Sequence, residues 1–175
     1  MKILAISGSG RAASTNTSML QALSATALPD VEIVVFDRIS DLPVFSPDLE
    51  ALTLPEPVQN FADLIRDSDG IIIASPEYVR AIPGGLKNAI DWLASRDEII
   101  EKPMALMHAS HRGDDMLEQL RLVLSTISTR FSADIFLQFD LMKRSPEEIS
   151  DVLQLPQHRR EMAAFLETFT KFCSQ

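Results

Sequence analysis

The sequence predicts an α/β fold in which a parallel β-sheet is covered by helices on both faces. Apolar runs of strand length alternate along the chain with segments whose apolar residues recur at helical spacing. The central runs are apolar throughout, which is typical of strands buried on both faces. With 175 residues, the chain is expected to form one domain over residues 1–175.

The first part of the chain contains two predicted strands and one helix. Residues 2–7 form an apolar run of strand length, and helical spacing then connects Asn16 to Ala27. A second strand is expected over residues 31–36. Residues 37–57 contain four prolines and are expected to form a long loop.

The same alternation continues to the end of the chain. Three further strands are predicted at residues 70–75, 103–108 and 133–139. Helical spacing is found at residues 58–65, 86–93, 116–127 and 162–169. Five strands favour the flavodoxin-like sheet order 2-1-3-4-5, with helices forming a layer on each side.

Composition and charge exclude several classes of partner. The net charge is −9 and the pI is about 4.7, so a nucleic acid or an anionic membrane would be repelled. No apolar run reaches the ~18–20 residues that a membrane span needs. The single cysteine, Cys173, can form no intrachain disulfide, which favours a reducing, cytoplasmic compartment.

The sheet order predicts where a ligand binds. In such sheets, ligands lie beyond the carboxyl ends of the strands, next to the point where the strand order reverses. The loops at residues 7–16, 76–83 and 108–114 are therefore the candidate binding segments.

The first of these loops has the composition of a phosphate-binding site. It is rich in small residues, ends at a helix N-terminus and adds hydroxyl, amide and guanidinium donors. The candidate phosphate ligands are Ser9, Arg11, Ser14, Thr15 and Asn16. An alternative interpretation is a simple helix cap made by Ser14 or Thr15.

The type of phosphate ligand is open at this point. Gly8, Gly10 and Ala13 also satisfy the dinucleotide pattern G-x-G-x-x-[GA], and Asp37 follows the second strand as a ribose-binding acid would. An NAD(P)-binding dehydrogenase is therefore an alternative. The loop has no Walker lysine, which argues against a P-loop NTPase.

The second loop has the features of a rigid wall for a planar heterocycle. Pro76 and Pro83 bracket it, and Tyr78 adds an aromatic side chain with a polar tip. Gly84 and Gly85 allow close approach of a ligand before the next helix begins.

These two loops together resemble the NADPH-dependent FMN reductase family of quinone, chromate and azo-dye reductases. The family pattern G-S-x-R-x-x-S-x-N matches residues 8–16 in full. The pattern S-P-E-Y-N-x-x-x-P-G-x-L-K-N-A-I-D-W matches residues 75–92 except that Val79 replaces the Asn. The resemblance covers residues 1–135.

The resemblance implies a function and a set of binding residues. FMN would be the bound cofactor, NADPH or NADH the hydride donor, and a small molecule the electron acceptor, in ping-pong order. The first loop would bind the FMN phosphate, and Pro76, Glu77, Tyr78, Val79 and Arg80 would line the isoalloxazine. From the third loop, Ser110, Arg112 and Gly113 would complete the site. No catalytic side chain and no metal ligand is expected.

The resemblance also implies a homo-oligomer, dimer or tetramer, with Trp92 and Leu93 on a helix next to the flavin loop. The third loop departs from the family's glycine-rich S-x-G-x-x-G-G, since only Gly113 remains and charged residues enter. His111 could act as a proton donor, although a solvated loop histidine is the favoured interpretation. A non-catalytic flavodoxin-like electron carrier or regulatory protein is a further alternative.

Overall fold

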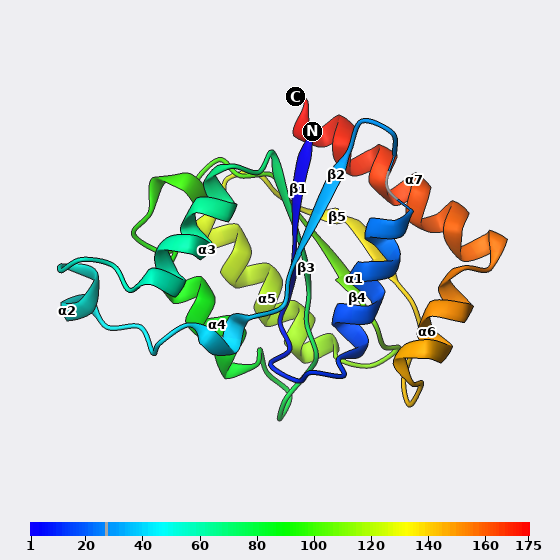
Figure 1. Cartoon of the computed structure of the whole chain (residues 1–175), viewed down its shortest axis with the longest axis horizontal. Coiled ribbons are helices and arrows are strands. Elements are labelled where there is room, and N and C mark those ends of the chain that lie inside the picture. The colour runs from blue at the N-terminus through cyan, green and yellow to red at the C-terminus, as the bar shows by residue number, and fades with distance from the viewer. Residues whose placement is uncertain (27) are drawn as a thin grey trace.

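The computed structural model describes residues 1–26 and 28–175 and places five strands in one parallel sheet (Figure 1). The strands are β1 (Lys2–Ser7), β2 (Glu32–Phe36), β3 (Gly70–Ala74), β4 (Met104–His108) and β5 (Phe131–Gln138). Their order is β2-β1-β3-β4-β5 and all four neighbouring pairs are parallel. The predicted flavodoxin-like order is confirmed.

Helices cover both faces of this sheet. One layer contains α3 (Glu56–Arg66), α4 (Gly84–Asp91) and α5 (Asp114–Ile127), and the other contains α1 (Thr15–Ala25), α6 (Pro146–Leu153) and α7 (Pro156–Cys173). Ala27, which the helical spacing placed at the end of the first helix, lies outside the described residues.

The alternation of side chains along each strand supplies a separate core to each layer. In β1, Leu4 and Ile6 pack with the α3, α4 and α5 layer, whereas Ile3 and Ala5 pack with the α1, α6 and α7 layer. All four side chains are buried. Burial on both faces explains why the central strands are apolar without interruption.

The structure adds short elements that the apolar pattern did not predict. The expected loop at 37–57 contains two short helices, η1 (Ile39–Asp41) and α2 (Pro47–Glu50), and η2 (Asp97–Ile99) precedes β4. Helix α6 was also missed, although Ser145 and Glu148 form a capping box at its start. These helices have three to eight residues, too few for a periodic pattern to show.

Helix α4 holds the proline-rich segment that follows β2. The Asn88 side chain accepts a hydrogen bond from the Phe45 amide (2.7 Å) and donates one to the Pro43 carbonyl (2.9 Å). Trp92 Nε1 donates to the same carbonyl (2.8 Å), and its ring meets Phe45 edge-on. Asn88 and Trp92 therefore have packing roles within this chain.

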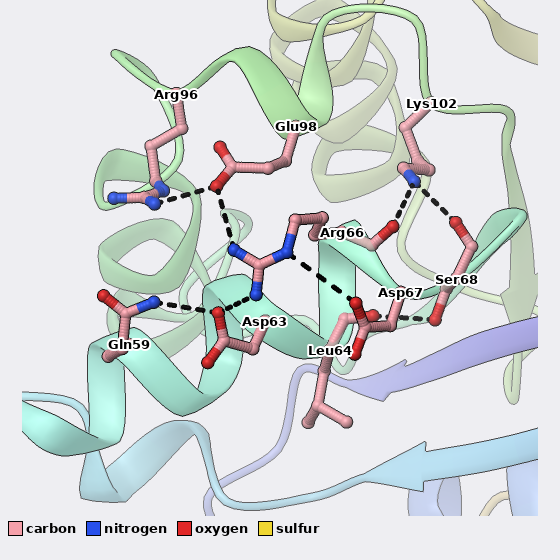
Figure 2. Close-up of polar contacts among 9 residues, drawn as sticks. All are labelled: Gln59, Asp63, Leu64, Arg66, Asp67, Ser68, Arg96, Glu98 and Lys102. Atoms are coloured by element: carbon pink, nitrogen blue, oxygen red, sulfur yellow. Dashed lines mark hydrogen bonds and ion pairs between the residues drawn. The ribbon is translucent and has the colours of Figure 1, made fainter.

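A network of charged side chains lies at the edge of the sheet where β3 and β4 begin (Figure 2). Arg66, at the end of α3, contacts Asp63 and Asp67, and it lies 4.0 Å from Glu98 of η2. Lys102 donates to the Ser68 carbonyl (2.5 Å), and burial lowers its pKa. The network joins α3 to η2 at the edge opposite the predicted binding loops.

Candidate FMN-binding site

The three predicted loops meet at the carboxyl edge of the sheet, where they border a cleft of about 390 Å³. The predicted binding residues that border this cleft are Thr15, Asn16, Pro76, Glu77, Ser110, Arg112 and Gly113. The cleft therefore joins the first motif to the second, as well as to the loop after β4.

Two of the predicted phosphate ligands, Ser9 and Ser14, instead make hydrogen bonds within the first loop and the start of α1. The Ser14 hydroxyl accepts a hydrogen bond from the Thr17 amide (3.3 Å) and so caps α1. The Ser9 hydroxyl accepts one from the Arg11 amide (3.2 Å). Both serines are buried, so they shape the loop, whereas Thr15 and Asn16 border the cleft.

Arg11 and Tyr78 lie apart from the other predicted ligands. They border a second hollow of about 380 Å³, together with Gly10, Ser40 and Gly84. The Arg11 side chain is exposed, and in the part of the chain that the structure describes it is in no ion pair. The predicted binding residues that border a hollow are thus divided between two, and Ser9, Ser14, Val79 and Arg80 border neither.

The tip of the loop after β3 is a tight turn with a left-handed backbone. Tyr78 and Ala81 exchange two backbone hydrogen bonds (3.2 and 3.1 Å), and the two residues between them have φ of 54° (Val79) and 61° (Arg80). Two successive positive φ values are typical of a type I′ turn, which favours Asn or Gly. The requirement explains the Asn of the family pattern and makes Val79, which is 98% exposed, a strained residue.

Arg80 is turned toward helix α5. Its Nε lies 2.5 Å from the Asp115 carboxylate, and this hydrogen bond lowers the pKa of Asp115. Its carbonyl accepts a hydrogen bond from Gln119 Nε2 (3.0 Å). These contacts hold the turn against α5. The Arg80 guanidinium is engaged in the ion pair with Asp115.

The loop after β4 is built on a buried histidine. Because the Arg112 carbonyl can only accept, His108 Nε2 must donate to it across 2.5 Å. In the neutral ring, Nδ1 is then a buried acceptor, and no donor among the described residues reaches it. Gly113, with φ of 108°, lies so close that a Cβ atom there would be 3.0 Å from His108 Nε2. Only glycine fits both the space and the backbone conformation.

The chain after β5 extends this wall of the cleft. Phe139 and Leu141 donate backbone hydrogen bonds to His108 (2.9 Å) and Ala109 (3.3 Å) of the β4 segment. His111 Nδ1 lies 3.1 Å from the Asp140 carboxylate, and the contact lowers the pKa of Asp140. Both side chains are more than half exposed, in agreement with the interpretation of His111 as a solvated loop residue.

Five residues that border the cleft were not among the predicted binding residues. They are Ser75, His108, Ala109, Met142 and Lys143. His108 lies within the expected binding segment 108–114, although it was not named as a binding residue, and the loop after the fifth strand was not among the expected binding segments. The signal for His108 was its place at the end of a predicted strand, where the third binding segment begins.

The family model described as NADPH-dependent FMN reductase matches residues 1–139. The chain belongs to this family. An NAD(P)H-dependent FMN reductase of Pseudomonas aeruginosa is 39% identical over 112 residues, which cover 63% of this chain and 60% of that protein. A quinone reductase of Escherichia coli K12 is 34% identical over 106 residues, which cover 60% and 55%. The chain therefore spans less than two thirds of the length of these relatives.

Solved structures support the fold. The flavoenzyme NAD(P)H:(acceptor) oxidoreductase FerB of Paracoccus denitrificans superposes with a TM-score of 0.74 over 98% of both chains, at 24% identity.

Membership of the family implies FMN as the cofactor and NAD(P)H as the electron donor. It decides against the dinucleotide-binding dehydrogenase suggested by Gly8, Gly10, Ala13 and Asp37.

The residues of the cleft fit FMN chemically. In the part of the chain that the structure describes, no donor reaches the buried atoms Asn16 Oδ1 and His108 Nδ1. FMN carries ribityl hydroxyls and a ring N–H that can donate to such acceptors. Thr15 begins helix α1, whose N-terminus favours an anion such as the phosphate. Within residues 1–26 and 28–175, no cluster of His, Cys, Asp and Glu could hold a metal ion.

Among the same residues, no helix has the length and apolar character needed to cross a membrane.

Proposed function

We propose that this chain is an FMN-dependent NAD(P)H oxidoreductase that passes electrons to quinones, free flavin, azo dyes or metal oxyanions. The observation that carries the proposal is the cleft in which the first motif, at Thr15 and Asn16, meets the second, at Pro76 and Glu77, and the loop after β4. The family match and the names of the curated relatives support the same function.

Different residues of the cleft would bind different parts of FMN. Thr15 and Asn16 would bind the phosphate and ribityl end, because they lie at the N-terminus of α1. Pro76 and Glu77 would border the ring on one side, and Ser110, Arg112 and Gly113 on the other. FMN, when bound, supplies the hydride-accepting and electron-donating chemistry. The protein contributes position, exclusion of water and charge.

We also propose ping-pong kinetics, since the donor and the acceptor would use the same open side of the cleft in turn. Initial rates measured at several acceptor concentrations should give parallel double-reciprocal lines. Intersecting lines would show that both substrates bind together and would contradict the shared site.

The basic test is the absorbance spectrum of the purified protein together with NAD(P)H consumption, with and without a quinone. Bound FMN with NAD(P)H oxidation supports the oxidoreductase. Bound FMN without oxidation would instead indicate an electron carrier. A protein that binds no FMN at micromolar concentration would overturn the proposal.

A homo-oligomer is proposed on the basis of the family resemblance, and a cytoplasmic location on the basis of the single cysteine. Trp92 and Leu93 do not contribute to a subunit surface as expected, because both are buried within this chain. Val44 and Leu52 are instead exposed on the segment after β2. Sedimentation at micromolar concentration tests the oligomer, and a monomer would contradict it.

A further inference from the structure

Lys143 lies on a tight turn after β5 that the family resemblance does not cover. The turn is closed by a hydrogen bond from the Arg144 amide to the Leu141 carbonyl (3.4 Å), and Leu141 is buried. Lys143 has φ of 64°, a conformation that a residue other than glycine adopts only when its surroundings impose it. The family model ends at residue 139, so this turn is a feature of this chain beyond the match.

The turn is held against the cleft by the segment that precedes it. Hydrogen bonds from Phe139 and Leu141 continue the pairing with the β4 segment, and His111 contacts Asp140. Lys143 thereby borders the same cleft as Thr15 and Asn16. In Figure 1, the chain between β5 and α6 passes the end of the molecule where α1 begins.

The charges around the cleft favour an anion at this place. Although the net charge of the chain is −9, two cations, Arg112 and Lys143, border the cleft. Among the residues that the structure describes, neither is in an ion pair. The acid on the cleft is Glu77, on the loop after β3. Arg11, the cation of the family motif, borders the other hollow.

We propose that the Lys143 ammonium group binds the phosphate of FMN at the N-terminal end of α1. This inference rests on the proposed function, because it takes FMN as the occupant of the cleft. Asn16 provides an independent indication of FMN there, since its side chain is buried on the cleft and no donor among the described residues reaches its Oδ1, which a ribityl hydroxyl beside the phosphate would fill. Lys143 is a binding residue and takes no part in the electron transfer.

The test compares FMN with riboflavin, which lacks the phosphate. Dissociation constants are measured by flavin fluorescence for the apoprotein and for Lys143→Gln, Lys143→Arg and Arg144→Gln. Gln retains the length of the side chain without the charge. Lys143→Gln should raise the FMN constant roughly tenfold and leave the riboflavin constant unchanged, as expected for one partly exposed charge-assisted hydrogen bond. Lys143→Arg should restore FMN binding.

Arg144→Gln is the matched control. It removes the neighbouring exposed charge outside the cleft, so it should leave both constants unchanged. Higher salt should reduce the difference between wild type and Lys143→Gln, because Lys143 is exposed.

Three outcomes would overturn the proposal. In the first, Lys143→Gln binds FMN as tightly as the wild type and its affinity for NADP⁺ relative to NAD⁺ is unchanged. In the second, it loses riboflavin as much as FMN, which would show damage to the cleft. In the third, the FMN constant is unchanged but the loaded enzyme loses its affinity for NADP⁺ relative to NAD⁺, which would assign Lys143 to a phosphate of the donor. Failure of the wild type itself to bind FMN would instead refute the proposed function.

Discussion

Replacing Val79 by Asn should make the protein more stable. Val79 has φ of 54°, and the left-handed region costs an ordinary residue roughly 1–2 kcal/mol. Asn tolerates this region better than a β-branched residue does. Because the Val79 side chain is 98% exposed, the substitution sacrifices no packing. We expect a gain of about 1 kcal/mol in the free energy of unfolding.

The assay is urea unfolding followed by tryptophan fluorescence or circular dichroism. With an m value of ~2 kcal/mol/M, the midpoint should rise by about 0.5 M, and the melting temperature by roughly 2–4 °C. Val44→Asn is the control, since Val44 is 82% exposed and is not among the described residues with positive φ. An unchanged or lower midpoint for Val79→Asn, or an equal rise for Val44→Asn, would refute the argument from backbone strain.

Four other substitutions test the site and the core. Arg11→Ala should weaken FMN binding by roughly 1.5–3 kcal/mol in a fluorescence titration if Arg11 reaches the phosphate, and an unchanged constant would remove it from the site. Arg112→Ala should lower the two-electron midpoint potential by ~30 mV for ~1.4 kcal/mol of lost charge stabilisation, and a dye-referenced titration giving the wild-type value would contradict this. Gly113→Ala should cost roughly 1–3 kcal/mol in denaturant unfolding, because its Cβ would lie 3.0 Å from His108; wild-type stability would show that the loop can shift. Burial raises the pKa of Cys173 from 9.0 to about 11, so the native state keeps a proton that the unfolded state loses. Stability should therefore fall between pH 9 and 11, and Cys173→Ala should remove this part of the fall; the same slope in the variant would assign it to other groups.

The sheet could be predicted because its signal is local and repeated. Along residues 3–6 of β1 and 71–74 of β3, the side chains pack alternately with one helical layer and the other, so burial alone makes each stretch an uninterrupted apolar run. Helix α6 is too short to show a period, and its start was marked only by the Ser145–Glu148 capping box. The β5 strand begins at Phe131, two residues before the predicted start, and its half-exposed edge position weakens the pattern there.

The loops that border the cleft were predicted, whereas the side chains that border it were predicted less well. The strand-order rule pointed to the edge of the sheet where the cleft lies, because it depends only on where parallel strands end. It does not say that the chain after β5 reaches the same cleft, and Lys143 was missed for that reason. Nor does a motif show in which direction a long side chain points. Arg80 is paired with Asp115, and Arg11 lies in a neighbouring hollow.

The pairing of β4 with the chain after it does not stop where the strands end. The amides of Phe139 and Leu141 donate to the carbonyls of His108 and Ala109, two residues that border the cleft. Their hydrogen exchange with solvent therefore requires the edge of the sheet to open locally. A molecule seated in the cleft would hold that edge closed and slow the exchange. Exchange at these two amides would report occupancy of the cleft even for a colourless ligand that produces no change in absorbance or fluorescence.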